Sequence, residues 1–498
     1  MKQVTRITID PITRLEGHGK IEIFLNDEGD VANTYFQVPE LRGFEQFSVG
    51  RLAEDMPVIT NRICGLCPEA HHMASVKALD DLFGVEPPFA AKKLRELLYM
   101  AFYVSDHTTH FYALGGPDFV LGPDAPPAER NVLGVIRKVG LDVGRQVIDC
   151  RARNHHVIQM LGGRGVHLCA GLPGGWSKSV SEEERAEIEK IAAKNIDFAL
   201  FTLKVFDDIV LKNPVYLDLV TSDIYLHKTY YMGTVDADNR VNFYDGMIRI
   251  VDPDGKEFAK YHPKEYPDHI AEHVEPYSYL KYPFIKKIGW KGFVDGKDSG
   301  VYAATPLSRL NVSDRMATPR AQEHFERMYE TFGSKKTNGR RQPVHYRLAT
   351  HWARLIELLY AAEHMMELAK DPEITSPDVR AIPSNIKGEG IGCVEAPRGT
   401  LTHHYVSDER GVLKKVNLIV GTTNNYATMT MSIKKAAEKL ITKGKIIEEG
   451  LLNRIEMAFR LYDPCLSCAT HSMPGKMPVI VNLRNPEGEI IRTFRRDG

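Results

Sequence analysis

Hydrophobic and polar positions follow two different periods along this chain. Near the N-terminus, residues 3–10, the run GKIEIFL and the run VANTYFQV alternate apolar and polar side chains. This alternation predicts strands with one buried face. The sequence NDEG separates the last two runs, and turn residues at that place predict a hairpin.

A helical period dominates the rest of the chain. Apolar residues recurring every three to four positions predict helices over 68–83, 89–114, 127–161, 181–210, 319–332, 345–370, 426–442 and 448–460. Pro68 stands at an early helical position, where a missing N–H does no harm, so we expect Cys67 to cap that helix. Ser181 followed by three glutamates is typical of a capped helix start.

Three segments interrupt the helical pattern. Residues 162–176, GGRGVHLCAGLPGGW, predict a glycine-rich loop that lacks the lysine and the glycine spacing of a phosphate loop. Residues 214–305 are rich in Tyr, Asp, Gly and Pro and predict a small β-rich insertion. Residues 394–421 predict a hairpin or small sheet, and after Pro474 the runs PVIVNLR and EIIRTFR flank an NPEG turn.

These elements predict an α+β fold that is predominantly helical, with a long-helix bundle core and small peripheral β-sheets. We find no repeat, low-complexity segment or clear linker. We expect one interlocked body over 1–471, made of an N-terminal β region (1–40), a helical core (41–213), the insertion (214–305) and a second helical part with a small sheet (306–471), followed by a C-terminal extension (472–498).

Composition excludes several classes of protein. The 498 residues are 43% hydrophobic and 26% charged, with a net charge of -1, so nothing indicates a nucleic-acid surface. No apolar run approaches the roughly 20 residues of a membrane span. The N-terminus has neither a signal-peptide core nor a twin arginine, so we expect a cytoplasmic protein. A chain exported as the passenger of a signal-bearing partner would look the same.

The cysteines carry the candidate chemistry. There are seven, an odd number in a long chain, so a disulfide framework is not expected. We expect Cys150, Cys169 and Cys393 to be buried thiols. The other four form two CxxC pairs, one in RICGLCPEAHH and one in LYDPCLSCATH.

Those two pairs stand near opposite ends of the chain: Cys64 with Cys67, and Cys465 with Cys468. Structural zinc sites usually join pairs about 15–20 residues apart, whereas this site would be assembled only by the complete fold. Four thiolates favour a soft metal. Spacing alone leaves zinc and a redox metal open.

The two cysteine motifs together resemble the metal-binding signatures of the [NiFe]-hydrogenase large subunit. Further family patterns match between them: RLEGH (14–18), RGFE (42–45), SDHTTHFY (105–112), GGRGVH (162–167), EAPRG (395–399) and VGTTNN (420–425). The resemblance spans about residues 5 to 471 and implies that fold. Its details favour the cytosolic, bidirectional group that is coupled to soluble carriers.

The resemblance implies a Ni-Fe(CN)2(CO) centre that cleaves H2 heterolytically. Cys64 and Cys465 would bind nickel alone, and Cys67 and Cys468 would bridge nickel to iron. Thiolates donate charge that brings nickel into a workable redox range, and the diatomic ligands supply chemistry that side chains cannot.

By the same resemblance, six residues act at or around the metals. The proton would be accepted by a terminal thiolate, with Cys465 as the first candidate, or by the carboxylate of Glu16. Arg398 would lie over the open metal position, because a guanidinium keeps its charge when desolvated. Its surroundings would be Asp106, Pro397 and Asp463, with the two carboxylates holding the arginine in place.

Further residues match secondary roles in the family. His71 would hydrogen-bond a bridging sulfur, and Thr422 would hydrogen-bond a cyanide, although Gly421 stands where the family often has proline. Glu45, His471 and a backbone carbonyl near Leu418 would bind a buried Mg²⁺, or iron in that role.

The resemblance also implies partners. The chain has no further cysteine cluster, so electrons would leave through an Fe–S-containing small subunit and further flavin or Fe–S electron-transfer subunits. His471 would end the mature chain, so Ser472–Gly498 would be removed by a maturation endopeptidase after nickel-insertion chaperones load the metal. A permanent C-terminal strand pair is the alternative for that segment.

Three other interpretations remain. A regulatory hydrogenase that senses H2 would share these motifs, although sensors generally lack the removable tail. A structural zinc protein with four cysteine ligands would share the two CxxC pairs. A metal-free relative such as the quinone-site subunit of respiratory complex I is disfavoured by the four cysteines.

Overall fold

The computed structural model describes residues 6–337, 340–471, 479–485 and 489–496. The chain begins with an antiparallel sheet of β1 (Arg6–Ile9), β2 (Lys20–Leu25) and β3 (Val31–Gln37), in that order. The hairpin predicted around Asn26 is confirmed, with Asn26 N–H donating to Asp30 O at 2.9 Å.

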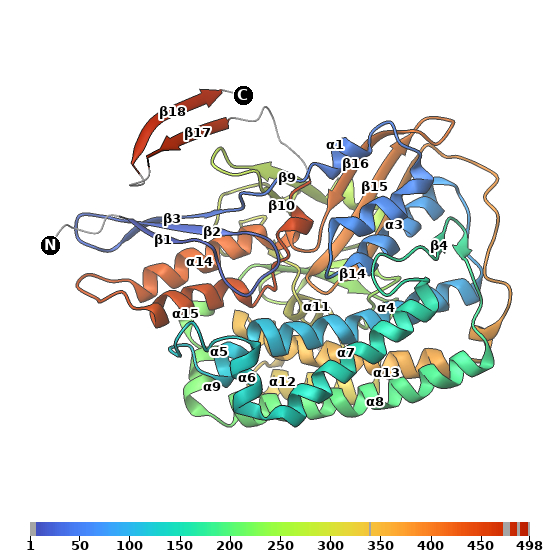
Figure 1. Ribbon diagram of the computed structural model, residues 1–498, viewed down its shortest axis with the longest axis horizontal. Helices are drawn as coiled ribbons and strands as arrows, with labels where there is room; N and C mark the ends of the chain where they lie inside the picture. The colour runs from blue at the N-terminus through green and yellow to red at the C-terminus, as the bar shows by residue number, and fades with distance from the viewer. Residues whose placement is uncertain (1–5, 338–339, 472–478, 486–488, 497–498) are drawn as a thin grey trace.

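Four long helices form the core and lie side by side in the lower half of Figure 1. They are α4 (Phe89–Thr109), α7 (Leu141–Gly162), α8 (Glu182–Phe206) and α13 (Thr350–Lys370). Helix α13 contacts both α8 and α4, and α4 contacts α7. The expected capping box of α8 is present, between Ser181 and Glu184. The predicted bundle core is therefore confirmed.

One helix prediction is wrong. The segment 127–161 forms two helices, α6 (Val132–Val139) and α7, because Gly140 adopts a φ of 98° between them. Glycine reaches that left-handed region without steric cost and so ends a helix. The apolar period continues across the break, which is why the sequence pattern does not reveal it.

Small sheets cover one side of the bundle. The predicted insertion is β-rich: β6 (Tyr230–Val235), β7 (Met247–Val251), β8 (Glu257–Tyr261) and β11 (Tyr302–Ala303) form a sheet of order β11-β6-β7-β8, and β9 (Ile270–Val274) pairs with β10 (Lys281–Ile285). A third sheet joins β14 (Glu389–Ala396), β15 (Gly399–Ser407) and β16 (Leu413–Ile419).

Strand β14 lies directly on helix α3 (Pro68–Leu82), which begins at the predicted cap Cys67. A Cβ atom on Gly390 or Gly392 would meet backbone atoms of α3 at distances that real Cβ atoms do not show. The two elements can therefore approach so closely only because the strand carries glycine there. This contact brings the RICGLC motif beside the EAPRG loop.

The remaining helices and strands are shorter than the four core helices. They are α1 (Phe44–Ser48), α2 (Met56–Thr60), α5 (Pro117–Val120), α9 (Pro214–Val220), α10 (Tyr266–His269), α11 (Pro306–Val312), α12 (Pro319–Thr331), α14 (Tyr426–Leu440), α15 (Glu449–Arg460), β4 (Gly171–Leu172), β5 (Gly175–Trp176), β12 (Lys336–Thr337) and β13 (Arg340–Arg341). Among the described residues, every helix is too short or too polar to cross a membrane.

The C-terminal extension contains the predicted strand pair. β17 (Val479–Arg484) and β18 (Ile490–Arg496) form an antiparallel hairpin, drawn at the upper left of Figure 1. Residues 472–478, which join it to the body, lie outside the described residues.

Two of the three cysteines outside the motifs are buried as expected. Cys150 and Cys393 are buried, but Cys169 is exposed. Cys169 lies in the glycine-rich loop, where the chain runs over the surface instead of through the core.

Candidate metal centre

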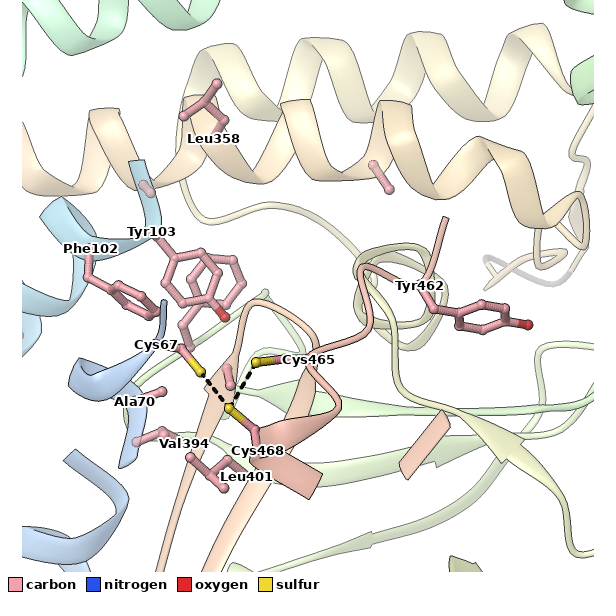
Figure 2. Packing of buried hydrophobic residues seen from close by; sticks show 14 of the residues in the cluster. Cys67, Ala70, Phe102, Tyr103, Leu358, Val394, Leu401, Tyr462, Cys465 and Cys468 are labelled. Carbon is pink, nitrogen blue, oxygen red and sulfur yellow. Dashed lines mark hydrogen bonds between the residues drawn. The ribbon is translucent and has the colours of Figure 1, made fainter. Parts of the chain in front are cut away.

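The two cysteine pairs meet in the interior, and we call them the four-sulfur site: Cys64, Cys67, Cys465 and Cys468. Their sulfur atoms all lie within 4.8 Å of one another, and all four residues are buried. Cys67 Sγ lies 3.6 Å and Cys465 Sγ 2.9 Å from Cys468 Sγ (Figure 2). Cys64 Sγ lies 3.4 Å from Cys465 Sγ.

Local backbone geometry presents these sulfurs. The N–H groups of Leu66 and Cys67 both point at Cys64 Sγ, at 3.2 and 3.1 Å. On the other side, Asp463 takes a φ of 54°, which turns the chain out of α15 and into the second cysteine motif. A non-glycine residue in that region is uncommon, and such strain often marks functional sites.

The electrostatics of the four-sulfur site fit a bound cation. Burial opposes ionisation, yet hydrogen bonds from Cys465 and Cys468 hold the pKa of the Cys64 thiol well below its ordinary value. Burial and the neighbouring Cys468 thiol raise the pKa of Cys465 well above the ordinary value. Burial and the neighbouring thiols therefore oppose ionisation of several of these cysteines at once. A soft cation removes this penalty, since metal-bound thiols are deprotonated.

Glu16 lies at the edge of the four-sulfur site. Its Oε2 accepts from the thiol of Cys465 at 3.0 Å and from Ser467 N–H at 3.2 Å. The backbone N–H of Leu466 donates to Glu16 O at 2.9 Å. Gly17 leaves room for this approach, because a Cβ there would lie 2.8 Å from Ser467 N. The RLEGH motif is thereby joined to the second cysteine motif.

Arg398 lies on another side, inside a buried ion-pair cluster. Its NH1 donates to Asp106 Oδ1 at 3.1 Å, and its NH2 lies 3.1 Å from Asp463 Oδ2. Burial works against the charge, but the two carboxylates raise the pKa of Arg398 well above its ordinary value. The guanidinium therefore stays charged, and its charge lowers the pKa of Cys64.

The structure also gives positions for the predicted hydrogen-bonding residues. The hydroxyl of Thr422 accepts from Cys465 N–H at 3.1 Å. Pro397 precedes Arg398 in the turn between β14 and β15. His71 Nδ1 lies 3.2 Å from His403 Nε2, while its buried Nε2 contacts no polar partner in the described structure.

The predicted magnesium ligands also lie together. Glu45 N–H donates to His471 O at 3.3 Å, and Glu45 Oε1 accepts from Leu418 N–H at 2.8 Å. The amide of Leu418 therefore lies next to the carboxyl of Glu45, and metal binding by a carbonyl near Leu418 stays a prediction. Burial raises the pKa of Glu45 and lowers that of His471 to about 3, so it favours the neutral form of both side chains.

Sequence reasoning missed three polar residues near Glu45: Lys281, Glu272 and Asn417. Lys281 Nζ lies 3.4 Å from Glu45 Oε1, 3.3 Å from Glu272 Oε2 and 3.1 Å from Asn417 Oδ1. The ammonium of Lys281 thus pairs with two carboxylates and an amide oxygen beside the predicted magnesium ligands. Lys281 and Glu272 belong to the insertion, which is the least diagnostic part of the resemblance, so no sequence signal singled them out.

Comparisons with known proteins agree with this geometry. A family model described as nickel-dependent hydrogenase matches residues 42–131 and 145–471, and one described as HoxL-like matches residues 6–41. The chain is 50% identical to an iron-sulfur subunit of the F420-non-reducing hydrogenase of Archaeoglobus profundus, over 98% of this chain and 99% of that protein.

Two further comparisons concern a hydrogenase of another type. This chain is 37% identical to the NAD-reducing hydrogenase HoxS subunit beta of Cupriavidus necator, over 98% of each chain. A crystal structure of an NAD+-reducing [NiFe]-hydrogenase in the H2-reduced state superimposes with a TM-score of 0.86 at 35% identity, covering 94% of this chain and 100% of that one.

Proposed function

The chain belongs to the nickel-dependent hydrogenase family, as the catalytic large subunit of a [NiFe] hydrogenase, and we propose that the four-sulfur site holds its nickel–iron centre. The observation that carries the proposal is the convergence of four buried sulfurs beside Glu16 and the Arg398 cluster. Cys64 and Cys465 would hold nickel alone, and Cys67 and Cys468 would share it with an iron carrying CN⁻ and CO. When bound, that centre supplies the redox chemistry and the site at which H2 is split.

The side chains then accept and transfer the proton that H2 cleavage releases. Cys465 Sγ and Glu16 Oε2 are 3.0 Å apart, which is hydrogen-bonding reach for a transfer between thiol and carboxylate. Ser467 N–H fixes the carboxylate from the other side. We assign Cys465 as the first proton acceptor and Glu16 as the group that carries the proton outward.

Arg398 contributes a fixed positive charge. Asp106 and Asp463 hold it on two sides in a buried region, where charges act more strongly than in water. Such a charge stabilises negative charge that develops during H2 cleavage and needs no reorganisation. His71 would steady a bridging sulfur through its free Nε2, and Thr422 would orient a cyanide ligand.

A second metal is proposed at Glu45, His471 and the backbone near Leu418. Mg²⁺ keeps several waters and takes few protein ligands, which fits the two side chains and the nearby oxygens of Glu272 and Asn417. Its function would be to fix the segment that follows Cys468. Iron is the alternative ion.

The electrons would leave to an Fe–S-containing small subunit, and then to flavin or Fe–S electron-transfer subunits. The three cysteines outside the four-sulfur site, Cys150, Cys169 and Cys393, are single residues and form no CxxC pair. Four exposed apolar residues lie in sequence between the RGFE and RICGLC motifs: Phe47, Val49, Leu52 and Val58. Gly65, next to Cys64, is also exposed, so a partner that covers Gly65 would come close to the metals. Cytoplasmic location stays a prediction.

The extension after His471 would be removed during maturation. The family match ends at residue 471. We propose that nickel-insertion chaperones load the metal first, that an endopeptidase then cleaves after His471, and that the new terminus settles against the second metal.

Metal analysis with infrared spectroscopy tests the proposal on the purified complex. We expect nickel and iron near 1:1 and stretching bands of CO and CN⁻, which no zinc protein shows. Zinc alone, without those bands, would overturn it. H2 oxidation that is too slow to sustain turnover would favour the H2-sensing alternative.

A further inference from the structure

Arg309 is a fully buried arginine close to the Arg398 loop, and it lies on α11, outside the motifs identified in the sequence. Nε and NH2 donate to the two carboxylate oxygens of Glu357, each at 2.6 Å. NH1 donates to Glu395 Oε2 at 3.2 Å and to Ala396 O at 3.0 Å, and NH2 donates to Pro397 O at 3.0 Å. All five guanidinium donors therefore have acceptors.

The last two acceptors are the backbone carbonyls that immediately precede Arg398. A carbonyl fixed at Ala396 and another at Pro397 fix the direction in which the chain leaves β14. The carbonyl of Arg398 itself accepts from Asn425 Nδ2 at 2.8 Å. The backbone of the turn is thus held on both sides of the residue.

A second connection runs from Arg309 to the partner of Arg398. Glu357 Oε2 lies 3.0 Å from His107 Nε2. Burial lowers the pKa of His107 to about 4, so the neutral ring donates this hydrogen bond. His107 follows Asp106 on α4, and Asp106 accepts from Arg398 at 3.1 Å. Arg309 therefore braces both the backbone of Arg398 and the helix that carries its carboxylate.

The surroundings leave this network little freedom. Arg309 lies over the ring of Phe243, 5.5 Å from its centroid, and that ring stacks on Tyr103 at 4.1 Å. The hydroxyls of Tyr99 and Tyr103 both donate to the backbone carbonyl of Glu395. Buried ion pairs seldom stabilise a fold more than apolar residues would, so stability alone is a poor reason for this cluster.

We propose that Arg309 is a positioning residue of the hydrogenase, which aims Arg398 at the metal centre by clamping the Ala396 and Pro397 carbonyls and, through Glu357 and His107, the Asp106 segment. The inference rests on the role proposed above for Arg398. It assigns Arg309 no contact with H2 or with the metals.

Lysine cannot replace this clamp. An ammonium carries the same charge but has three donors on one nitrogen, whereas the guanidinium spreads five donors over a planar fork. In Arg309→Lys, the carbonyls of Ala396 and Pro397 lose their donors and the turn relaxes. A misplacement of about 1 Å near a reacting centre can cost on the order of 100-fold in rate.

A double-mutant cycle in the complete complex tests the inference. We expect Arg309→Lys to lower kcat by about 100-fold while nickel and iron contents stay at the wild-type level. The CO and CN⁻ infrared bands should shift, because the charge near the diatomic ligands moves. In an Arg398→Lys background, the additional effect of Arg309→Lys on kcat should be below about 3-fold, since coupled residues are not additive.

Arg95 provides a matched control. It is another buried arginine that pairs with a carboxylate, Asp80, and donates to two carbonyls, those of Leu172 and Gly175. We expect Arg95→Lys to lower the thermal unfolding midpoint as Arg309→Lys does, with kcat and the infrared bands unchanged. Glu357→Gln removes the other half of the clamp at constant size and should reproduce the Arg309→Lys pattern.

Each alternative outcome is decisive. Rate losses that multiply in the double variant overturn the inference, as does loss of nickel in both Arg309→Lys and Glu357→Gln. If Arg398→Lys impairs turnover and Arg309→Lys does not, the inference alone fails. If Arg398→Lys leaves turnover unchanged, the proposed role of Arg398 fails first and the inference falls with it.

Discussion

At the scale of single residues, function in this chain depends on polar groups that are buried next to one another. Glu16 contacts Cys465, the four sulfurs lie within 4.8 Å of one another, and Arg398 pairs with Asp106 and Asp463, although these residues come from distant parts of the sequence. Motif resemblance predicted these residues. It did not predict Arg309, Glu357 or Lys281, because a buried arginine or glutamate carries no spacing signal of its own.

The first prediction concerns Glu16→Gln. Glutamine keeps the size and can still contact Cys465 and Ser467, but it cannot accept a proton at neutral pH. We expect H2 oxidation to fall by about 10²–10⁴-fold with nickel content unchanged, measured by dye reduction under H2 and by metal analysis. Glu28→Gln, at an exposed position in the N-terminal hairpin, should behave as wild type. Full turnover in a nickel-loaded Glu16→Gln enzyme would show that the proton leaves elsewhere.

The second prediction concerns pH and His72. Its Nδ1 lies 3.1 Å from Pro57 O, and its Nε2 accepts from Gly171 N–H at 3.0 Å, so the fold requires the neutral ring. Burial lowers the pKa of His72 to about 4. Because the folded-state pKa is below the unfolded value, the stabilisation is complete above about pH 6.5 and is lost as pH falls toward 4.

Unfolding midpoints between pH 7.5 and 4.5 test this. The unfolding free energy of His72→Gln should be lower than that of wild type at pH 7.5. This difference in unfolding free energy should shrink by up to about 3 kcal/mol at acid pH. Other buried histidines lower stability in both proteins, so only the difference matters. A constant difference across the range would contradict the assignment.

At the scale of elements, close packing between α3 and β14 sets the distance between two motifs. The helix begins at Cys67 and the strand ends just before Arg398. The pattern of apolar residues predicted a helix and a sheet there, but not that glycines in the strand let the two backbones touch. Element type was readable from local periodicity, whereas the contact depends on residues more than 300 positions apart.

The third prediction is a destabilisation in Gly392→Ala. The added methyl would overlap the carbonyl of Ala74, so the strand must move away from the helix. We expect a loss of about 1–3 kcal/mol in unfolding free energy and weaker nickel retention, measured by thermal melting and by metal content after dialysis. Gly165→Ala meets only ordinary contacts and should change neither. Equal stability of the two variants would argue against the close packing.

At the scale of the whole molecule, the four-sulfur site is closed by the two ends of one body. Cys64 and Cys465 lie 3.4 Å apart although 401 positions separate them. The site therefore exists only in the complete fold, unlike a local zinc knuckle. The C-terminal extension begins at the residue after the second cysteine motif. Removal of the extension is therefore expected to affect the metal ligands in that motif.

The fourth prediction concerns that extension. Intact mass spectrometry of active complex should show a large-subunit chain ending at His471, the residue at which the family match ends. Apo protein from nickel-starved cells should retain residues up to Gly498. A fully active chain that still ends at Gly498 would favour the permanent strand pair instead.

Local periodicity and short motifs of fixed spacing were sufficient to predict the helical core, the small sheets and the family. They also identified which cysteines are ligand candidates. The buried groups that support those motif residues, Arg309 and Glu357 among them, became visible only in three dimensions. The break at Gly140, the exposure of Cys169, the Lys281 cluster and the Arg309 clamp all depend on backbone angles and on contacts between distant segments. Side-chain packing between those segments determines these features. The linear pattern of apolar and polar residues contains no information on that packing.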